Sequence, residues 1–118
     1  MDEPVGNRVR MHRKNAGLSQ YELGKLLGYG DDGQVSRHER SRSLPTFLMA
    51  LSYQCIFCVR IAELFGGLHE SVAQSVEGRI AELEKNLRQR DAGTARAAAT
   101  ARKFEWLQER RSRSYAHR

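Results

Sequence analysis

Apolar side chains recur at spacings of three and four along most of the chain, and no stretch of several residues alternates apolar with polar side chains. The first pattern is typical of helices with one buried face, whereas alternation is typical of half-buried strands. Clusters rich in Gly, Asp and Ser separate the helical stretches, as turns do. The 118 residues are enough for one domain, or for one small domain with an appendage. The sequence therefore predicts an all-α fold.

The clearest local signal is a capping box at residues 19–22. The Ser19 hydroxyl can accept a hydrogen bond from the amide of Glu22, whose carboxylate can reach back to the amide of Ser19. Three leucines follow on one side of the predicted helix: Leu23, Leu26 and Leu27. Gly28 ends this helix, because glycine adopts the left-handed conformation of a C-terminal stop without a steric penalty.

The remaining helical segments follow the same apolar spacing. Helices are predicted over residues 3–16, 32–40, 59–65, 68–87 and 95–111, and another begins after a cap at Thr46. Gly66 and Gly67 end the fifth helix and suggest a boundary. We therefore expect one domain over residues 1–67 and a C-terminal helical region over residues 68–118 with a basic tail.

Residues 28–33 hold three Gly and two Asp, which predicts a tight turn followed by a helix N-terminus. In the short helix that follows, Val35 is expected to point inward, and its polar and basic neighbours are expected to point outward. Two short helices joined in this way are typical of a helix-turn-helix, whose second helix lies in the major groove of DNA. Gln and Arg suit that position, because Gln pairs with adenine and Arg with guanine.

Paired motifs carry a family resemblance in this part of the chain. They are Gly-Leu-Ser-Gln at 17–20 and Val-Ser-Arg-His-Glu-Arg at 35–40, supported by shorter matches between them and on either side. Residues 5–65 resemble the Cro/cI-type (XRE-like) helix-turn-helix proteins of bacteria and their phages and plasmids. The resemblance implies a five-helix, lambda-repressor-like domain, here followed by two C-terminal helices. It also implies sequence-specific DNA binding, usually as a dimer and usually in repression.

The resemblance implies DNA-binding roles for six side chains: Gln20, Gln34, Ser36, Arg37, Arg40 and Arg42. Gln20 would contact a phosphate or brace the recognition helix. The next three would face the groove, and the last two would hold the DNA backbone. Phosphate contacts fix the register, and only groove-facing residues specify sequence.

The sequence departs from the family pattern at the front of the recognition helix. The turn is about one residue longer than the commonest version, and Asp31 and Asp32 stand where many relatives carry neutral polar residues. A carboxylate there would repel phosphate, so at least one of the two is interpreted as a helix cap. The first base-reading residue is left open.

Several other side chains have structural interpretations. Arg10 is expected to pair with Glu39, whereas Arg13 is expected to lie on a solvated face. His38 stands where the family has a bulky, half-buried residue, which indicates packing. Cys55 and Cys58 are expected to be small core residues, because no second pair completes a zinc site and no strand–helix context supports redox chemistry.

The formal net charge of +6 favours acidic partners, with nucleic acid first. Two cysteines make no disulfide framework, which is typical of a reducing cytosol. The N-terminal residues are acidic rather than apolar, so they do not resemble a signal peptide. No apolar run approaches the ~20 residues of a membrane-spanning helix. No catalytic motif stands out, so we expect a cytoplasmic protein that is not an enzyme and needs no cofactor or metal.

The apolar stripe from Leu68 to Leu87 favours association through the C-terminal helices. The leading hypothesis is a dimeric transcriptional regulator, a repressor that binds a palindromic operator in double-stranded DNA. The sequence leaves open an antitoxin-like interaction module, in which the C-terminal helices bind a protein partner. Binding of the basic tail to a membrane surface is the weakest alternative.

Overall fold

The structure, a computed structural model, describes residues 6–89 and 94–116. These residues form helices and contain no strand, which confirms the all-α prediction. The helices are α1 (Val9–Asn15), α2 (Gln20–Leu27), α3 (Gly33–Glu39), α4 (Phe47–Phe57), α5 (Ile61–Leu64), α6 (Gly66–Gln89) and α7 (Thr94–Ala116). The described chain forms two compact units that meet between Gln74 and Ser75, inside α6.

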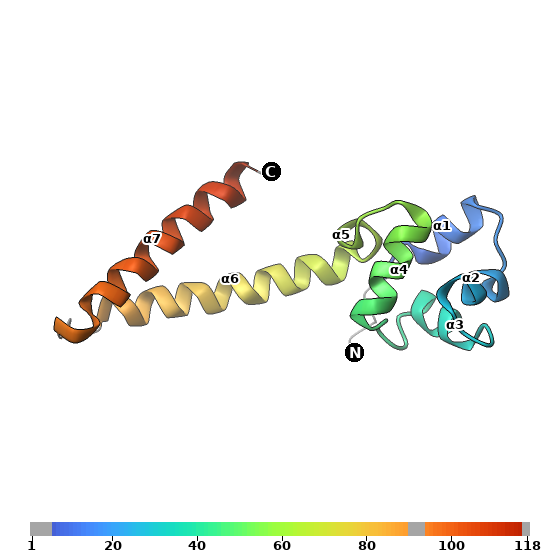
Figure 1. The fold of residues 1–118 in the computed structure, drawn as a ribbon, viewed down its shortest axis with the longest axis horizontal. Helices are drawn as coiled ribbons and strands as arrows, with labels where there is room; N and C mark the ends of the chain where they lie inside the picture. The colour runs from blue at the N-terminus through green and yellow to red at the C-terminus, as the bar shows by residue number, and fades with distance from the viewer. Residues whose placement is uncertain (1–5, 90–93, 117–118) are drawn as a thin grey trace. The chain divides into compact units, whose positions relative to one another are not determined.

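The first unit gathers the short helices α1 to α5 (Figure 1). Helix α1 begins at Val9, later than predicted, and the side chain of Asn7 accepts a hydrogen bond from the Val9 amide at 3.0 Å. Residues 3–5 of the predicted first helix lie outside the described residues. The amide of Arg8 donates to the carbonyl of Leu64 at 2.8 Å, so the start of α1 is joined to α5.

Helix α2 confirms the capping box. The Glu22 amide donates to Ser19 Oγ at 3.0 Å, and the Ser19 amide donates to Glu22 Oε1 at 2.9 Å. These bonds to Ser19 also lower the pKa of the Glu22 carboxyl. Gly28 ends the helix in the left-handed conformation with φ of 93°, as predicted. Both ends of α2 are therefore set by local sequence.

The core of the first unit lies among α1 to α5. Its seven buried residues come from all five helices and the residue after α5: Val9, Leu23, Leu27, Val35, Tyr53, Leu64 and Phe65. Helix α3 contacts both α2 and α1, and α4 contacts α2 and α5. Gly24 lies against the turn before α3, where a Cβ would stand 2.6 Å from the carbonyl oxygen of Asp31. The absence of a side chain at Gly24 therefore permits the close approach of α2 to this turn.

Helix α4 begins as predicted, because Thr46 Oγ1 accepts a hydrogen bond from the Met49 amide at 3.2 Å. Its inward residues are Ala50 and Tyr53. The predicted core role of Cys55 and Cys58 is wrong, because both thiols are exposed. Almost every residue of this helix is apolar, so the sequence alone does not show which face is buried.

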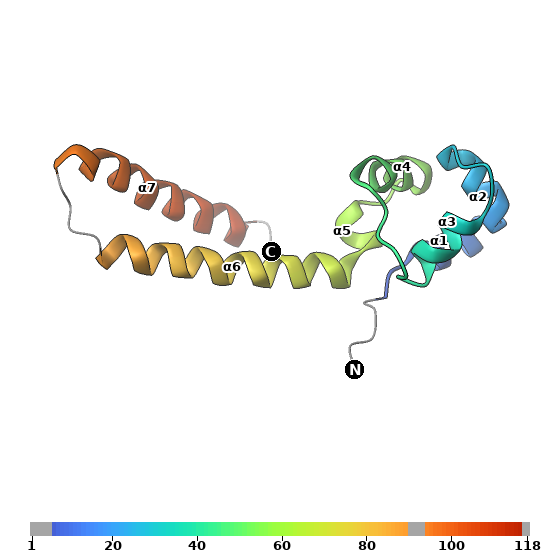
Figure 2. The same cartoon turned by 90° about the horizontal axis from the view of Figure 1, so that it is seen from below.

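Helix α5 ends at Leu64, close to the predicted end, and Gly66 and Gly67 open helix α6 directly after Phe65. In the second unit, α7 returns along α6 in the opposite direction (Figure 2). Leu87 and Leu107 are buried there, and Glu77 and Glu84 form ion pairs with arginines of α7. The predicted break near residues 91–94 lies mostly outside the described residues.

None of the described helices combines the length and apolar character needed to cross a bilayer.

Candidate nucleic-acid interface

Helix α3 has one face turned into the core and one turned outward. Val35 and His38 are buried. Arg37 and Arg40 are exposed, and Gln34 and Ser36 are partly exposed. Arg42 is exposed on the loop that follows, and its amide donates to the Arg37 carbonyl at 2.8 Å. The proposed groove-facing and backbone-binding side chains therefore lie on one short helix and its C-terminal loop.

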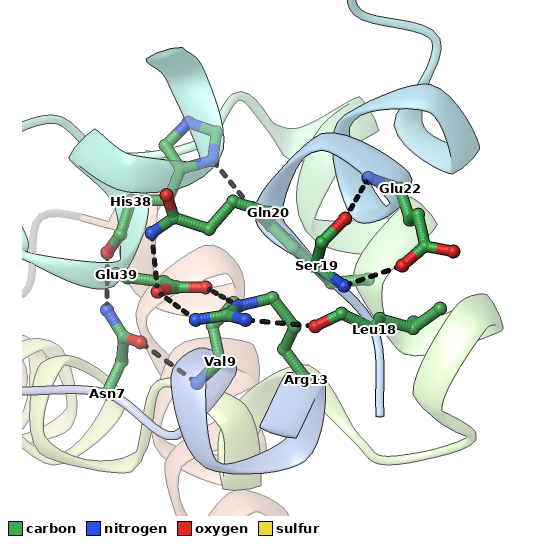
Figure 3. Close-up of polar contacts among 10 residues, drawn as sticks. Asn7, Val9, Arg13, Leu18, Ser19, Gln20, Glu22, His38 and Glu39 are labelled. Carbon is green, nitrogen blue, oxygen red and sulfur yellow. Dashed lines mark hydrogen bonds and ion pairs between the residues drawn. The ribbon is translucent and has the colours of Figure 1, made fainter. Parts of the chain in front are cut away.

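A buried ion pair fixes the end of α3 (Figure 3). Arg13 Nε donates to Glu39 Oε2 at 2.6 Å, and Arg13 Nη2 donates to Glu39 Oε1 at 3.2 Å. The side chains of Arg13 and Glu39 are only 11% and 3% exposed. Arg13 Nη1 also donates to the carbonyl of Leu18 at 2.9 Å. This bidentate pair therefore connects α1, the α1–α2 loop and α3.

Gln20 completes the same cluster, because its Nε2 donates to Glu39 Oε1 at 3.1 Å (Figure 3). The Glu39 carboxylate thus receives hydrogen bonds from α1 and from the first residue of α2. Of the two roles that the sequence suggested for Gln20, the structure shows the bracing contact to α3. The orientation of α3 is consequently held by side chains from both preceding helices.

The predicted pairing of Arg10 with Glu39 is wrong, as is the solvated face predicted for Arg13. The two arginines lie one turn apart on α1, and either could have been turned toward α3. Packing of Val9 in the core sets the rotation of α1 and turns Arg13 toward Glu39. Arg10 is exposed instead. No local sequence signal distinguishes the two, since Arg13 and Glu39 are 26 residues apart.

Arg10 and Arg40 border a pocket of about 160 Å³ that is also lined by Gln20 and the Arg13–Glu39 pair. Both border arginines are exposed. Guanidinium groups bind phosphate oxygens through paired, charge-assisted hydrogen bonds. This pocket can therefore hold one phosphate oxyanion beside the outward face of α3.

His38 fastens α3 to α4. This residue is 2% exposed, and its Nδ1 lies 2.8 Å from the hydroxyl of Tyr53. Burial lowers the pKa of His38, and the nearby positive charge of Arg37 lowers it further. Burial also raises the pKa of Tyr53. The burial of His38 against Tyr53 confirms packing as its role.

The head of α3 shows how the two aspartates differ. Asp31 Oδ1 accepts a hydrogen bond from the Gly33 amide at 2.9 Å, so Asp31 satisfies the first amide of the helix. Asp32 occupies the N-cap position without a side-chain capping bond. The interpretation of one aspartate as a cap is thus supported for Asp31, and Asp32 remains an exposed carboxylate at the front of the helix.

A second contact at the C-terminal end of α3 was not predicted from the sequence. Asn7 Nδ2 donates to the His38 carbonyl at 2.8 Å, one of the carbonyls at the helix C-terminus (Figure 3). No sequence signal marks this bond, because it joins residues 31 positions apart. No group of three or more potential metal ligands occurs within the described segments. The chain matches no family model, no curated protein and no solved structure.

Proposed function

We propose that this chain is a sequence-specific DNA-binding transcriptional regulator of the lambda-repressor-like kind, with α2 and α3 as its helix-turn-helix. The observation that carries the proposal is the two-sided character of α3. Its inner side is tied to α1 and α2 through Glu39, and its outer side presents Arg37 and Arg40. A helix fixed in this way fits the major groove, which is ~12 Å wide.

Some of the outward side chains contact bases, and the others contact phosphates. Gln34, Ser36 and Arg37 read base edges, with Arg37 suited to guanine and Gln34 to adenine. Arg40 and Arg42 bind the DNA backbone. Arg40 and Arg10 hold one phosphate at the pocket that they border. Gln20 acts mainly as a brace for α3. Base contacts set the preferred sequence, and phosphate contacts set the position of the helix on it.

The regulator acts as a dimer and represses by covering its operator. In the second unit, helix α6 exposes Val76 and Leu83, whose spacing of seven places them on one helix face. A second copy of the chain covers this face, and a two-fold dimer then reads a palindrome with half-sites ~34–36 Å apart. The substitutions Val76→Gln and Leu83→Gln should convert the dimer to monomer in sedimentation experiments. A wild-type chain that sediments as a monomer would contradict the dimer.

Selection of duplexes from a random DNA pool tests the proposal directly. We expect one enriched palindromic sequence, and tighter binding to it than to a scrambled duplex at the same salt concentration. Arg37→Ala should weaken binding to the enriched duplex by roughly 1–3 kcal/mol and relax the preference at one base pair. Titrations with labelled duplexes give both values.

Arg60→Ala is the matched control. It removes one positive charge from an exposed position of the same unit, just before α5. This variant should bind the enriched duplex with nearly wild-type affinity and unchanged base preference. A pool without any enriched sequence would refute the proposal. An Arg37→Ala variant with unaltered base preference would refute the assignment of α3 as the reading helix.

A further inference from the structure

The positive charge of the chain is concentrated in the second unit. Residues 75–118 contain eleven Lys and Arg against six Asp and Glu, a formal charge of +5. Residues 1–74 contain nine against eight, a formal charge of +1. The unit that carries the recognition helix is therefore nearly neutral. The electrostatic attraction of the chain for a polyanion originates mainly in the α6–α7 unit.

Four residues of α7 form what we call the basic stripe: Arg96, Lys103, Trp106 and Arg113. They are separated by seven, three and seven positions, which places them within an arc of about 100° along about 25 Å of helix. All three basic side chains are exposed, and Trp106 is 42% exposed. The stripe thus combines three cations with one exposed aromatic ring.

The cations of the stripe are available for an outside partner. Arg102, Arg110 and Arg111 of the same helix form ion pairs with glutamates, whereas Arg96, Lys103 and Arg113 form none among the described residues. Glu109, one turn before Arg113, is engaged by Arg102 instead. The glutamates in these ion pairs therefore neutralise other arginines and leave the stripe positively charged.

We propose that the basic stripe of α7 is a second DNA-binding surface, which grips the phosphate backbone of double-stranded DNA without reading its sequence. Lys103 and Arg113 pair with phosphate oxygens, and the Trp106 indole N–H can donate to another. The choice of DNA as partner rests on the proposed function. If α3 binds a duplex, the same chain brings phosphates to the stripe at high effective concentration.

The burial pattern of α7 argues against a membrane as the partner. A helix that lies in a membrane surface presents a broad apolar face with several large side chains. On α7, Leu107 is buried and Phe104 is half-buried, and Trp106 is the one large apolar side chain exposed within the described part of this helix. One ring among three cations matches a phosphate backbone better than a lipid interior.

The test measures the salt dependence of DNA binding by the full chain. A plot of log K against log salt concentration has a negative slope. Its magnitude decreases by about 0.9 for each phosphate that the protein no longer neutralises. The double substitution Lys103→Gln with Arg113→Gln should therefore decrease the magnitude of the slope by about 1.8. The decrease should be the same for the preferred duplex and for a scrambled one. Circular dichroism should show unchanged helix content, because both side chains are exposed.

The matched control removes the same charge from the same unit away from the stripe. Arg79 and Lys85 are exposed on α6 and form no ion pair among the described residues. The double substitution Arg79→Gln with Lys85→Gln should leave the slope close to the wild-type value. An equal fall in both double variants would overturn the proposal, because it would show a general charge effect instead of a defined surface.

Trp106 gives an independent signal, since it is the only tryptophan of the chain. Addition of a scrambled duplex at low salt should change its fluorescence in a saturable, salt-reversible way, and the Lys103/Arg113 variant should lose this change. The change should persist in Arg37→Ala, which separates failure of sequence reading from failure of the stripe. A change with anionic phosphatidylserine vesicles and none with DNA would overturn the proposal, as would no change with either.

Discussion

Truncation of Glu39 to alanine tests whether the buried ion pair holds α3 in place. The change removes the acceptor of three hydrogen bonds, two from Arg13 and one from Gln20. The Arg13 side chain is only 11% exposed. After the change, its guanidinium keeps one of its hydrogen bonds, to the Leu18 carbonyl. Removing one partner of a buried pair typically costs ~3–5 kcal/mol, because the other charge stays desolvated.

A loss of that size is a large part of the ~5–15 kcal/mol by which a small domain is stable. It corresponds to a fall in Tm of at least about 12 °C for a unit of this length. Circular dichroism during urea and thermal unfolding measures the loss. Trp106 fluorescence follows the second unit, so it shows whether the destabilisation is confined to the first unit.

A double-mutant cycle makes the reasoning refutable. Replacing both partners, as in Arg13→Met with Glu39→Leu, should recover at least half of the lost stability, because no buried charge is then left alone. Glu63→Ala, at an exposed carboxylate of α5, should leave the free energy of unfolding nearly unchanged. Additive losses from Arg13→Met and Glu39→Leu would refute the interpretation, since independent side chains show no coupling.

Two further perturbations test the packing around α3. Burial lowers the pKa of His38 below its ordinary value of 6.5. As the pH falls, His38 is therefore protonated more readily in the unfolded chain than in the folded one. Stability should therefore fall as the pH drops below about 6.5, and His38→Gln should lose less stability between pH 7 and 5 in urea titrations. Gly24→Ala should cost about 1–3 kcal/mol in the same assay, because its Cβ would meet the Asp31 carbonyl oxygen at 2.6 Å. A wild-type level of stability in Gly24→Ala would show that the turn can move away freely.

The features predicted correctly from sequence are those that nearby residues determine. The bonds between Ser19 and Glu22 span three positions, and the Gly28 stop depends only on its own backbone conformation. The inward positions of Leu23 and Val35 follow from helical spacing. Helix ends with a strong local signal were thus predicted correctly, whereas the start of α1, which has no such signal, lies later than predicted, at Val9.

The features that were predicted wrongly depend on how helices are rotated against one another. Arg10 and Arg13 differ only in which side of α1 they occupy, and that side is set by contacts with α3 and α5. Cys55 was misplaced because α4 is apolar on all sides and shows no preferred face. The bond from Asn7 to the His38 carbonyl joins distant segments, so sequence spacing could not suggest it.

The separation of the two faces of α3 has an evolutionary consequence. The side chains of Glu39 and His38 bind neighbouring helices. Within the described residues, the side chains of Gln34 and Arg37 form none of the hydrogen bonds that hold α3 in place. We expect substitutions at these two outer positions to leave folding largely unchanged. Under the proposed function, a duplicated gene would then reach a new operator in single steps. Under the same proposal, the base-reading residues of a known regulator could be transplanted onto α3 without disturbing the contacts that hold it.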